Sequence, residues 1–159
     1  MQRHVIALTI VAGLLARPVL VQAEADHTRE ASHAEFPHQT LGVFIGDTTE
    51  VRRAEGVTLG LEYEYRFTEV FGMGAIVERV MGDFDTNVYV ASMAYHRGPW
   101  KLYAGPGIED GEEGSEHLFR LGVEYGFHAG GYEISPQVDV DFVAGESLLV
   151  FGLVLARPF

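Results

Sequence analysis

Apolar and polar residues alternate over long stretches of this chain. From Val57 to Phe67 every odd position is apolar or aromatic, whereas the even positions hold Thr58, Gly60, Glu62, Glu64 and Arg66. Residues 119–128 and 132–142 repeat the alternation. Because successive side chains of a β-strand point to opposite faces, each stretch predicts a strand with one apolar and one polar face.

Segments of this kind recur at even spacing from residue 38 to the C-terminus, separated by clusters of Gly, Asp, Glu and Pro. They predict an all-β chain of about eight antiparallel, up-and-down strands. Three connections are tight, near 68–69, 97–99 and 129–131, whereas 47–55 and 110–116 are longer and charged. This asymmetry is typical of transmembrane barrels. The predicted strands are 38–47, 56–68, 70–81, 86–97, 100–109, 116–128, 132–142 and 147–159.

Alternation alone does not decide which face lies inside, since a soluble, lipocalin-like periplasmic binding barrel would bury the aromatic face. Glycines share the charged face, and the interior of an eight-stranded barrel is only wide enough for side chains. The glycines therefore favour the charges inside and the apolar residues against lipid, as in a transmembrane barrel. The glycines are Gly60, Gly72, Gly74, Gly122, Gly126 and Gly152.

Aromatic residues gather beside the tight turns, where they would form a girdle at one membrane interface. The predicted girdle comprises Tyr65, Phe67, Phe71, Tyr95, Trp100, Phe127, Tyr132 and Phe159. Two prolines oppose a closed barrel, because proline cannot donate to a strand ladder. Pro106 and Pro136 both fall within predicted strands, so we expect a β-bulge at each.

The first 23 residues read as a cleaved export signal: an apolar run from Val5 to Ala16 precedes Val21-Gln22-Ala23. The run is too short to span a bilayer as a helix, although a retained anchor is the alternative. Residues 24–37 are polar and carry His27 and His33. We interpret them as a periplasmic arm that precedes the barrel at 38–159.

The net charge of −12 opposes binding to nucleic acid. The histidines of the arm and His38 lie among carboxylates and could ligate a metal ion, but their spacing matches no compact metal motif. We therefore favour a solvated arm and expect neither a metal site nor a cofactor. Whether the arm binds metal stays open.

The last predicted strand has one apolar face and ends in an aromatic residue. Leu149, Phe151, Leu153 and Leu155 share one face and lead to the terminal Phe159. With segments 60–67 and 134–142, this end resembles the small outer-membrane β-barrel proteins of Gram-negative bacteria. The resemblance covers about residues 38–159 and implies an outer-membrane location, contact with outer-membrane lipid and recognition of Phe159 by the barrel-assembly machinery. No functional residue is carried over; we expect a monomer.

The predicted lumen contains a network of charges. Because these charges lie away from bulk solvent, they must pair with one another or bind water. We favour a non-enzymatic, structural or envelope barrel whose lumen this network plugs; a narrow pore for ions or very small solutes is the alternative. Ser115, Glu116 and His117 are weak evidence for a catalytic site, so we expect no enzyme. The network comprises Glu62, Glu64, Arg66, Glu78, Lys101, Arg120, Glu124, Asp139 and Asp141.

Overall fold

The computed structural model describes residues 37–50, 54–112 and 114–159. The predicted signal peptide and all of the predicted arm except Pro37 lie outside the described residues. Among the described residues, no helix has the length and apolar character needed to cross a membrane.

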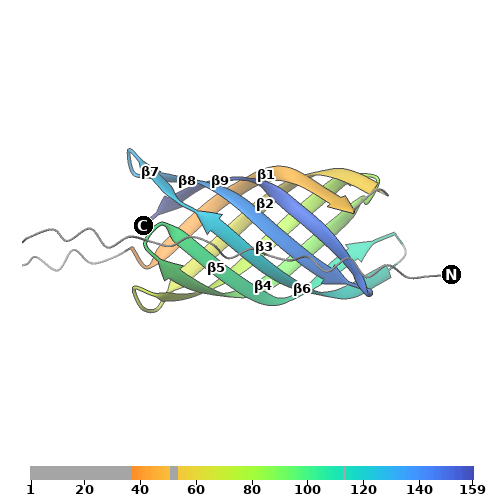
Figure 1. Cartoon of the computed structure of the whole chain (residues 1–159), viewed down its shortest axis with the longest axis horizontal. Helices are drawn as coiled ribbons and strands as arrows, with labels where there is room; N and C mark the ends of the chain where they lie inside the picture. The colour runs from red at the N-terminus through yellow and green to blue at the C-terminus, as the bar shows by residue number, and fades with distance from the viewer. Residues whose placement is uncertain (1–36, 51–53, 113) are drawn as a thin grey trace, which may run out of the picture. The chain divides into compact units, whose positions relative to one another are not determined.

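The described residues form antiparallel strands throughout, with bounds close to those predicted (Figure 1). The fourth strand spans 86–97, as the sequence predicts. The strands are β1 (Gln39–Glu50), β2 (Ala54–Arg66), β3 (Phe71–Gly82), β4 (Thr86–Arg97), β5 (Trp100–Gly111), β6 (Gly114–Tyr125), β7 (Phe127–Ala129), β8 (Tyr132–Val143) and β9 (Glu146–Pro158).

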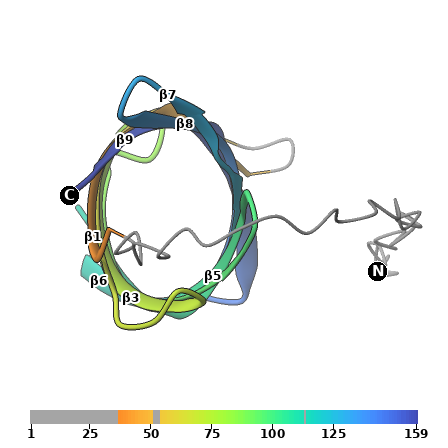
Figure 2. The same ribbon diagram turned by 90° about the vertical axis from the view of Figure 1, so that its left-hand side faces the viewer.

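The sheet closes on itself. From β1 to β6 and from β7 to β9 each strand pairs with the next along the chain, β6 also pairs with β8, and β9 pairs with β1. Since β6 and β7 are two parts of one strand interrupted at Gly126, the described residues form an eight-stranded barrel, which confirms the predicted fold (Figure 2). Gln39 and Phe159 exchange backbone hydrogen bonds of 3.2 and 2.8 Å where the first and last strands meet.

The pairing register fixes how far the strands tilt. If paired residues are followed from strand to strand around the barrel, starting at Gln39, the path returns to β1 at Thr49, ten residues further along. This offset, with eight strands, gives a tilt of about 40° and a barrel radius of about 8 Å, which leaves room inside for side chains only. The path passes through Tyr65, Met73, Met93, Ala104, Leu121, Val140 and Leu149.

Both prolines lie inside strands without the bulges that we expected. The β4–β5 register is the same before and after Pro106, and the register between β8 and β6–β7 is the same before and after Pro136, so no residue is inserted. Instead, the strand pairing omits the residue pairs whose hydrogen bonds would need the N–H group that proline lacks. The break between β6 and β7 falls at Gly126, whose register partner on β8 is Ser135, next to Pro136. The Gly126 N–H donates to Pro99 O at 2.7 Å.

The two ends of the barrel, or rims, differ. The terminal rim carries the β2–β3, β4–β5 and β7–β8 turns, Gln39 and the C-terminus (left in Figure 1). The distal rim carries the β1–β2, β3–β4, β5–β6 and β8–β9 connections. The longer loops predicted there are wrong, because 47–50 belong to β1 and 54–55 to β2, while β5 and β6 extend to Gly111 and from Gly114. The charged residues extend strand pairing instead of ending it.

The outward face of the barrel is apolar. Outward side chains such as Leu61 and Ile45 are each 57% exposed, whereas the inward Phe44 and Glu62 next to them are buried. Along β5 the apolar positions run from Trp100 to Ile108, which corresponds to a band about 20 Å tall at this tilt. Above it the outward positions turn polar. A soluble barrel with a buried aromatic face is therefore excluded. The polar positions are Asp47, Glu55, Arg79, Asn87, Asp110, His117 and Ser147.

Candidate functional site in the barrel lumen

The widest side chain on the inner wall of β1, Phe44, sits in a cradle of glycines. Phe44 is 0% exposed and packs with Val150, Val154 and Ala156. A Cβ at Gly152 would lie 2.7 Å from the Phe44 ring and 2.3 Å from a backbone oxygen, and one at Gly46 would lie 2.6 Å from the ring. The glycines on the inner face therefore make room for a large residue in a narrow lumen, as the alternation suggested.

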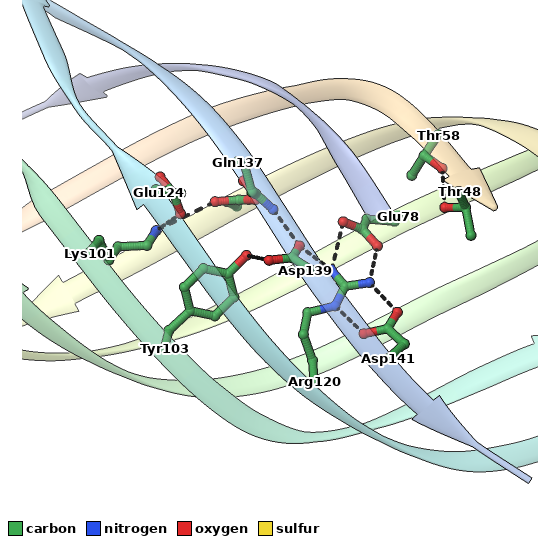
Figure 3. Close-up of polar contacts among 11 residues, drawn as sticks. Thr48, Thr58, Glu78, Lys101, Tyr103, Arg120, Glu124, Gln137, Asp139 and Asp141 are labelled. Carbon is green, nitrogen blue, oxygen red and sulfur yellow. Dashed lines mark hydrogen bonds and ion pairs between the residues drawn. The ribbon is translucent and has the colours of Figure 1, made fainter. Parts of the chain in front are cut away.

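A fully buried arginine lies near the middle of the lumen (Figure 3). Arg120 donates to both carboxylate oxygens of Glu78 at 2.8 and 2.7 Å, and to both oxygens of Asp141 at 2.6 Å. The register explains the second pair, because Arg120 on β6 lies directly opposite Asp141 on β8. Both carboxylates are bound in the bidentate geometry that gives arginine its strongest contacts.

Asp139 extends this group towards the terminal rim. Its Oδ2 lies 3.6 Å from Arg120 Nη1, and it accepts hydrogen bonds from the Tyr103 hydroxyl at 2.6 Å and from Gln137 Nε2 at 2.7 Å. Tyr103 and Gln137 are themselves buried. We refer to Glu78, Arg120, Asp139 and Asp141 as the arginine cluster; with their hydrogen-bond partners they link four different strands across the lumen.

A second group of charges surrounds Lys101 near the terminal rim. The Lys101 ammonium contacts Glu124 and lies 3.5 Å from Glu64 and 3.7 Å from Glu62. Glu64 also binds His96 Nε2 at 2.5 Å. These residues line a cavity of about 60 Å³, which has room for about four water molecules. Glu62 Oε1 has no hydrogen-bond partner among the described residues, so it is positioned to bind such water.

Apolar side chains close the lumen beyond the arginine cluster. They form one packed cluster with Phe84 of the β3–β4 connection, which we call the apolar cap: Val80, Val88, Leu118, Val143 and Leu148. The cavity between cap and cluster measures about 10 Å³, about the minimum needed by a single water molecule.

Eight of the nine predicted lumen charges belong to the arginine cluster or to the group around Lys101. The ninth, Arg66, lies at the terminal rim, where its guanidinium donates to the Glu69 carbonyl. Sequence reasoning missed Tyr103, Gln137 and His96. Tyr103 and His96 occur on less regular strands, whereas Gln137 stands on the predicted polar face but carries no charge that would place it in the predicted network.

The eight predicted girdle residues lie at or beside the terminal rim, each between 37% and 59% exposed. Several are in ring contact: Phe71 and Tyr95 are 5.6 Å apart, and Trp100 packs edge-on against Tyr125 at 4.8 Å. Tyr125, which also contacts Phe127, was not included in the prediction although it shares their face.

Two other candidate sites do not assemble in the described residues. Ser115, Glu116 and His117 belong to β6 and not to a loop, so Glu116 points away from the other two side chains. Ser115 donates instead to Asp110 at 2.5 Å. The described residues hold no group of three His, Asp or Glu side chains arranged to bind a metal, and His27 and His33 lie outside them.

No family model matches the sequence, and no curated protein matches it. Solved structures do. The N-terminal β-barrel domain of OprF from Pseudomonas aeruginosa superposes with a TM-score of 0.58 at 12% identity, over 79% of this chain and all of that domain. Ail, an outer-membrane protein of Yersinia pestis, gives 0.54 at 12% over 77% and 99%. A designed transmembrane β-barrel gives 0.54 at 11% over 76% and 96%.

These likenesses, the closed sheet and the outward apolar band define one class of protein. The chain has the fold of the small, eight-stranded outer-membrane β-barrels, which confirms the predicted resemblance at the level of the fold. In such a barrel the outward band faces lipid and the lumen charges face each other. The predicted outer-membrane location follows from this architecture.

Proposed function

We propose that the protein is a non-enzymatic structural component of the outer membrane whose lumen is closed to solutes. The arginine cluster supports this function most directly, because one buried side chain binds carboxylates of β3 and β8 and so connects walls of the barrel. The apolar cap adds a second barrier. A permeating ion would have to break bidentate ion pairs and then pass the packed side chains of the apolar cap.

A narrow pore is the alternative, and conductance separates the two. We expect refolded full-length protein in planar bilayers to give no resolved current steps, while a porin added to the same bilayer does. The double variant Arg120→Ala with Glu78→Ala should give brief openings, and Arg79→Ala, at an exposed ion pair near the distal rim, should stay silent. Regular, ion-selective steps from the unmodified protein would overturn the closed lumen.

The absence of enzymatic activity is part of the proposal. It is supported by Ser115, Glu116 and His117, whose places on β6 do not bring a nucleophile, a base and an orienting acid together. It is also supported by the lumen, where the buried carboxylates are engaged by Arg120, Lys101 and their neighbours.

We further propose that the barrel is a monomer in outer-membrane lipid and that Phe159 is its recognition site for the barrel-assembly machinery. Phe159 is 59% exposed and ends the strand that closes the barrel against β1. A terminal aromatic residue at this seam would be available to a partner before closure and to lipid afterwards.

A further inference from the structure

The distal rim opens into a mouth of about 680 Å³ that is strongly acidic. Its acidic residues come from four connections or strand ends: Glu50, Asp83, Asp85, Glu109, Glu112, Glu116 and Glu146. The sequence places Arg52 and Arg53 in the β1–β2 connection, outside the described residues. The terminal rim is different, because Arg66, Arg97 and Arg157 there outnumber Glu69 and Glu133. The charge is therefore concentrated at one end of the barrel.

Several of these carboxylates are already engaged. Asp85 pairs with Arg79, and Asp83 accepts from the Glu55 backbone N–H at 3.2 Å. The side chains of Glu112 and Glu116, by contrast, have no hydrogen bond or ion pair within the described part of the chain, and both line the mouth. Glu112 lies in the β5–β6 connection and Glu116 near the start of β6. Neither lies opposite a cation of the described barrel, so their negative charge is available to a ligand.

The floor of the mouth is apolar. Phe84 of the β3–β4 connection packs on the apolar cap and lines the mouth together with Val143 and Leu148. A metal ion gains nothing from such a floor, whereas an apolar side chain gains free energy by covering it. The mouth thus combines acidic walls with a hydrophobic base.

One buried polar group also points to a ligand. The Thr86 side chain is 9% exposed and lines the mouth, and its Oγ1 has no hydrogen-bond partner among the described residues. The Glu109 side chain lies beside it and interacts with it, although the pair falls outside good hydrogen-bond geometry. A buried hydroxyl without a partner costs free energy, and a ligand that hydrogen-bonds to it removes that cost.

We propose that the distal mouth binds a short cationic peptide segment. An aliphatic side chain of the segment covers Phe84, lysine or arginine side chains pair with Glu112 and Glu116, and a peptide group bonds to Thr86. Charge complementarity selects a basic partner over an anionic one. The apolar floor selects a peptide over a simple cation. The site lies on the outer surface of the apolar cap, so a peptide can bind there while the lumen stays closed.

The test uses the full-length barrel in nanodiscs of zwitterionic phosphatidylcholine, titrated by calorimetry with the amidated peptide Lys-Leu-Lys-Leu-Lys. Lys-Ser-Lys-Ser-Lys, which has the same charge, and empty nanodiscs are the controls. We expect the leucine peptide to bind at least about tenfold more tightly than the serine peptide, since two aliphatic side chains are available to cover the floor. Binding should weaken as salt is raised.

Variants locate the site. The double variant Glu112→Gln with Glu116→Gln should weaken binding of the leucine peptide by about fivefold, because two solvated ion pairs are lost. Phe84→Ser should reduce the preference for leucine over serine by about tenfold. Glu69→Gln, an acidic-to-neutral change at the terminal rim, is the matched control and should leave binding unchanged. Heat-modifiable migration on gels verifies that each variant is folded.

Three results would overturn the proposal. Equal affinity for both peptides would mean that only counterion attraction operates. Unchanged affinity in the Glu112 and Glu116 double variant would place the peptide elsewhere. Tight binding of Ca²⁺ to the same barrel, with no peptide signal above the empty nanodiscs, would make the mouth a cation site. None of these outcomes bears on the closed lumen, which the conductance experiment tests separately.

Discussion

Replacing Arg120 by methionine removes the charge at the centre of the lumen while keeping most of the side-chain volume. Arg120 is 0% exposed and donates four hydrogen bonds to Glu78 and Asp141. In Arg120→Met these carboxylates, with Asp139, face each other without a permanent cation among the described residues of the cluster. The variant therefore measures the stability that the cluster contributes.

The expected loss is large. Removing one partner of a buried ion pair destabilises proteins by about 3–5 kcal/mol, because the other charge stays buried and uncompensated. Arg79→Met is the matched control: its pair with Asp85 is exposed, and exposed pairs contribute about 0–1 kcal/mol. Replacing two of the carboxylates in Arg120→Met, by Glu78→Gln and Asp141→Asn, should recover much of the loss, since Asp139 is then the one charge of the cluster that remains and it keeps its hydrogen bonds from Tyr103 and Gln137.

Urea unfolding in phosphatidylcholine vesicles measures this, with Trp100 fluorescence and heat-modifiable migration as independent probes. Protonation of the uncompensated carboxylates should restore stability to Arg120→Met as the pH is lowered, and less so to the unmodified barrel, whose carboxylates there are paired. A loss below about 1 kcal/mol for Arg120→Met, equal to that of Arg79→Met, would refute the reasoning that the cluster is a dry, tightly paired plug.

Other residues give separate predictions. Phe44→Ala should cost about 3–5 kcal/mol in the same urea assay, because its glycine cradle cannot collapse to fill the cavity; a loss below about 1 kcal/mol would mean that the ring is not packed as described. Trp100 emission should be quenched more by lipids brominated near the headgroup than near the chain end, and the reverse order would remove it from the interface. Deleting Phe159 should lower the fraction of heat-modifiable barrel in cells while refolding in vesicles is little changed; an equal defect in both would make the role of Phe159 one of stability.

The sequence predicted the strands and their faces because the alternation is strict where it matters. Within 57–67, 119–128 and 132–142 the polar face occupies every second position, so burial on one face could be assigned before any pairing was known. The fourth strand was also predicted with correct bounds although Val90 stands on its inner face. Inward apolar residues such as Val90 pack above and beside the lumen charges. The alternation of apolar and polar residues does not distinguish these inward apolar positions from lipid-facing ones.

The contacts within the lumen could not be predicted in the same way. The alternation of side chains along a strand is enough to place Arg120 and Asp141 on the inner face. Their direct pairing, however, depends on the register of β6 against β8. The register depends in turn on connections far apart in the chain. The same limit explains the prolines: sequence identifies Pro106 and Pro136 as unable to donate, but whether the ladder inserts a residue or skips a bond is decided by the neighbouring strand.

The most direct test of the whole account concerns which face of the barrel meets lipid. The chain contains no cysteine, so single cysteines can be placed at each position from Val57 to Tyr65 and spin-labelled in the refolded, vesicle-bound protein. We predict that collision with dissolved oxygen, which concentrates in lipid, is high at odd positions such as Leu61 and low at even positions such as Thr58 and Glu62. Oxygen collisions that peak at the even positions, or that show no period of two, would contradict a transmembrane barrel with its charges inside.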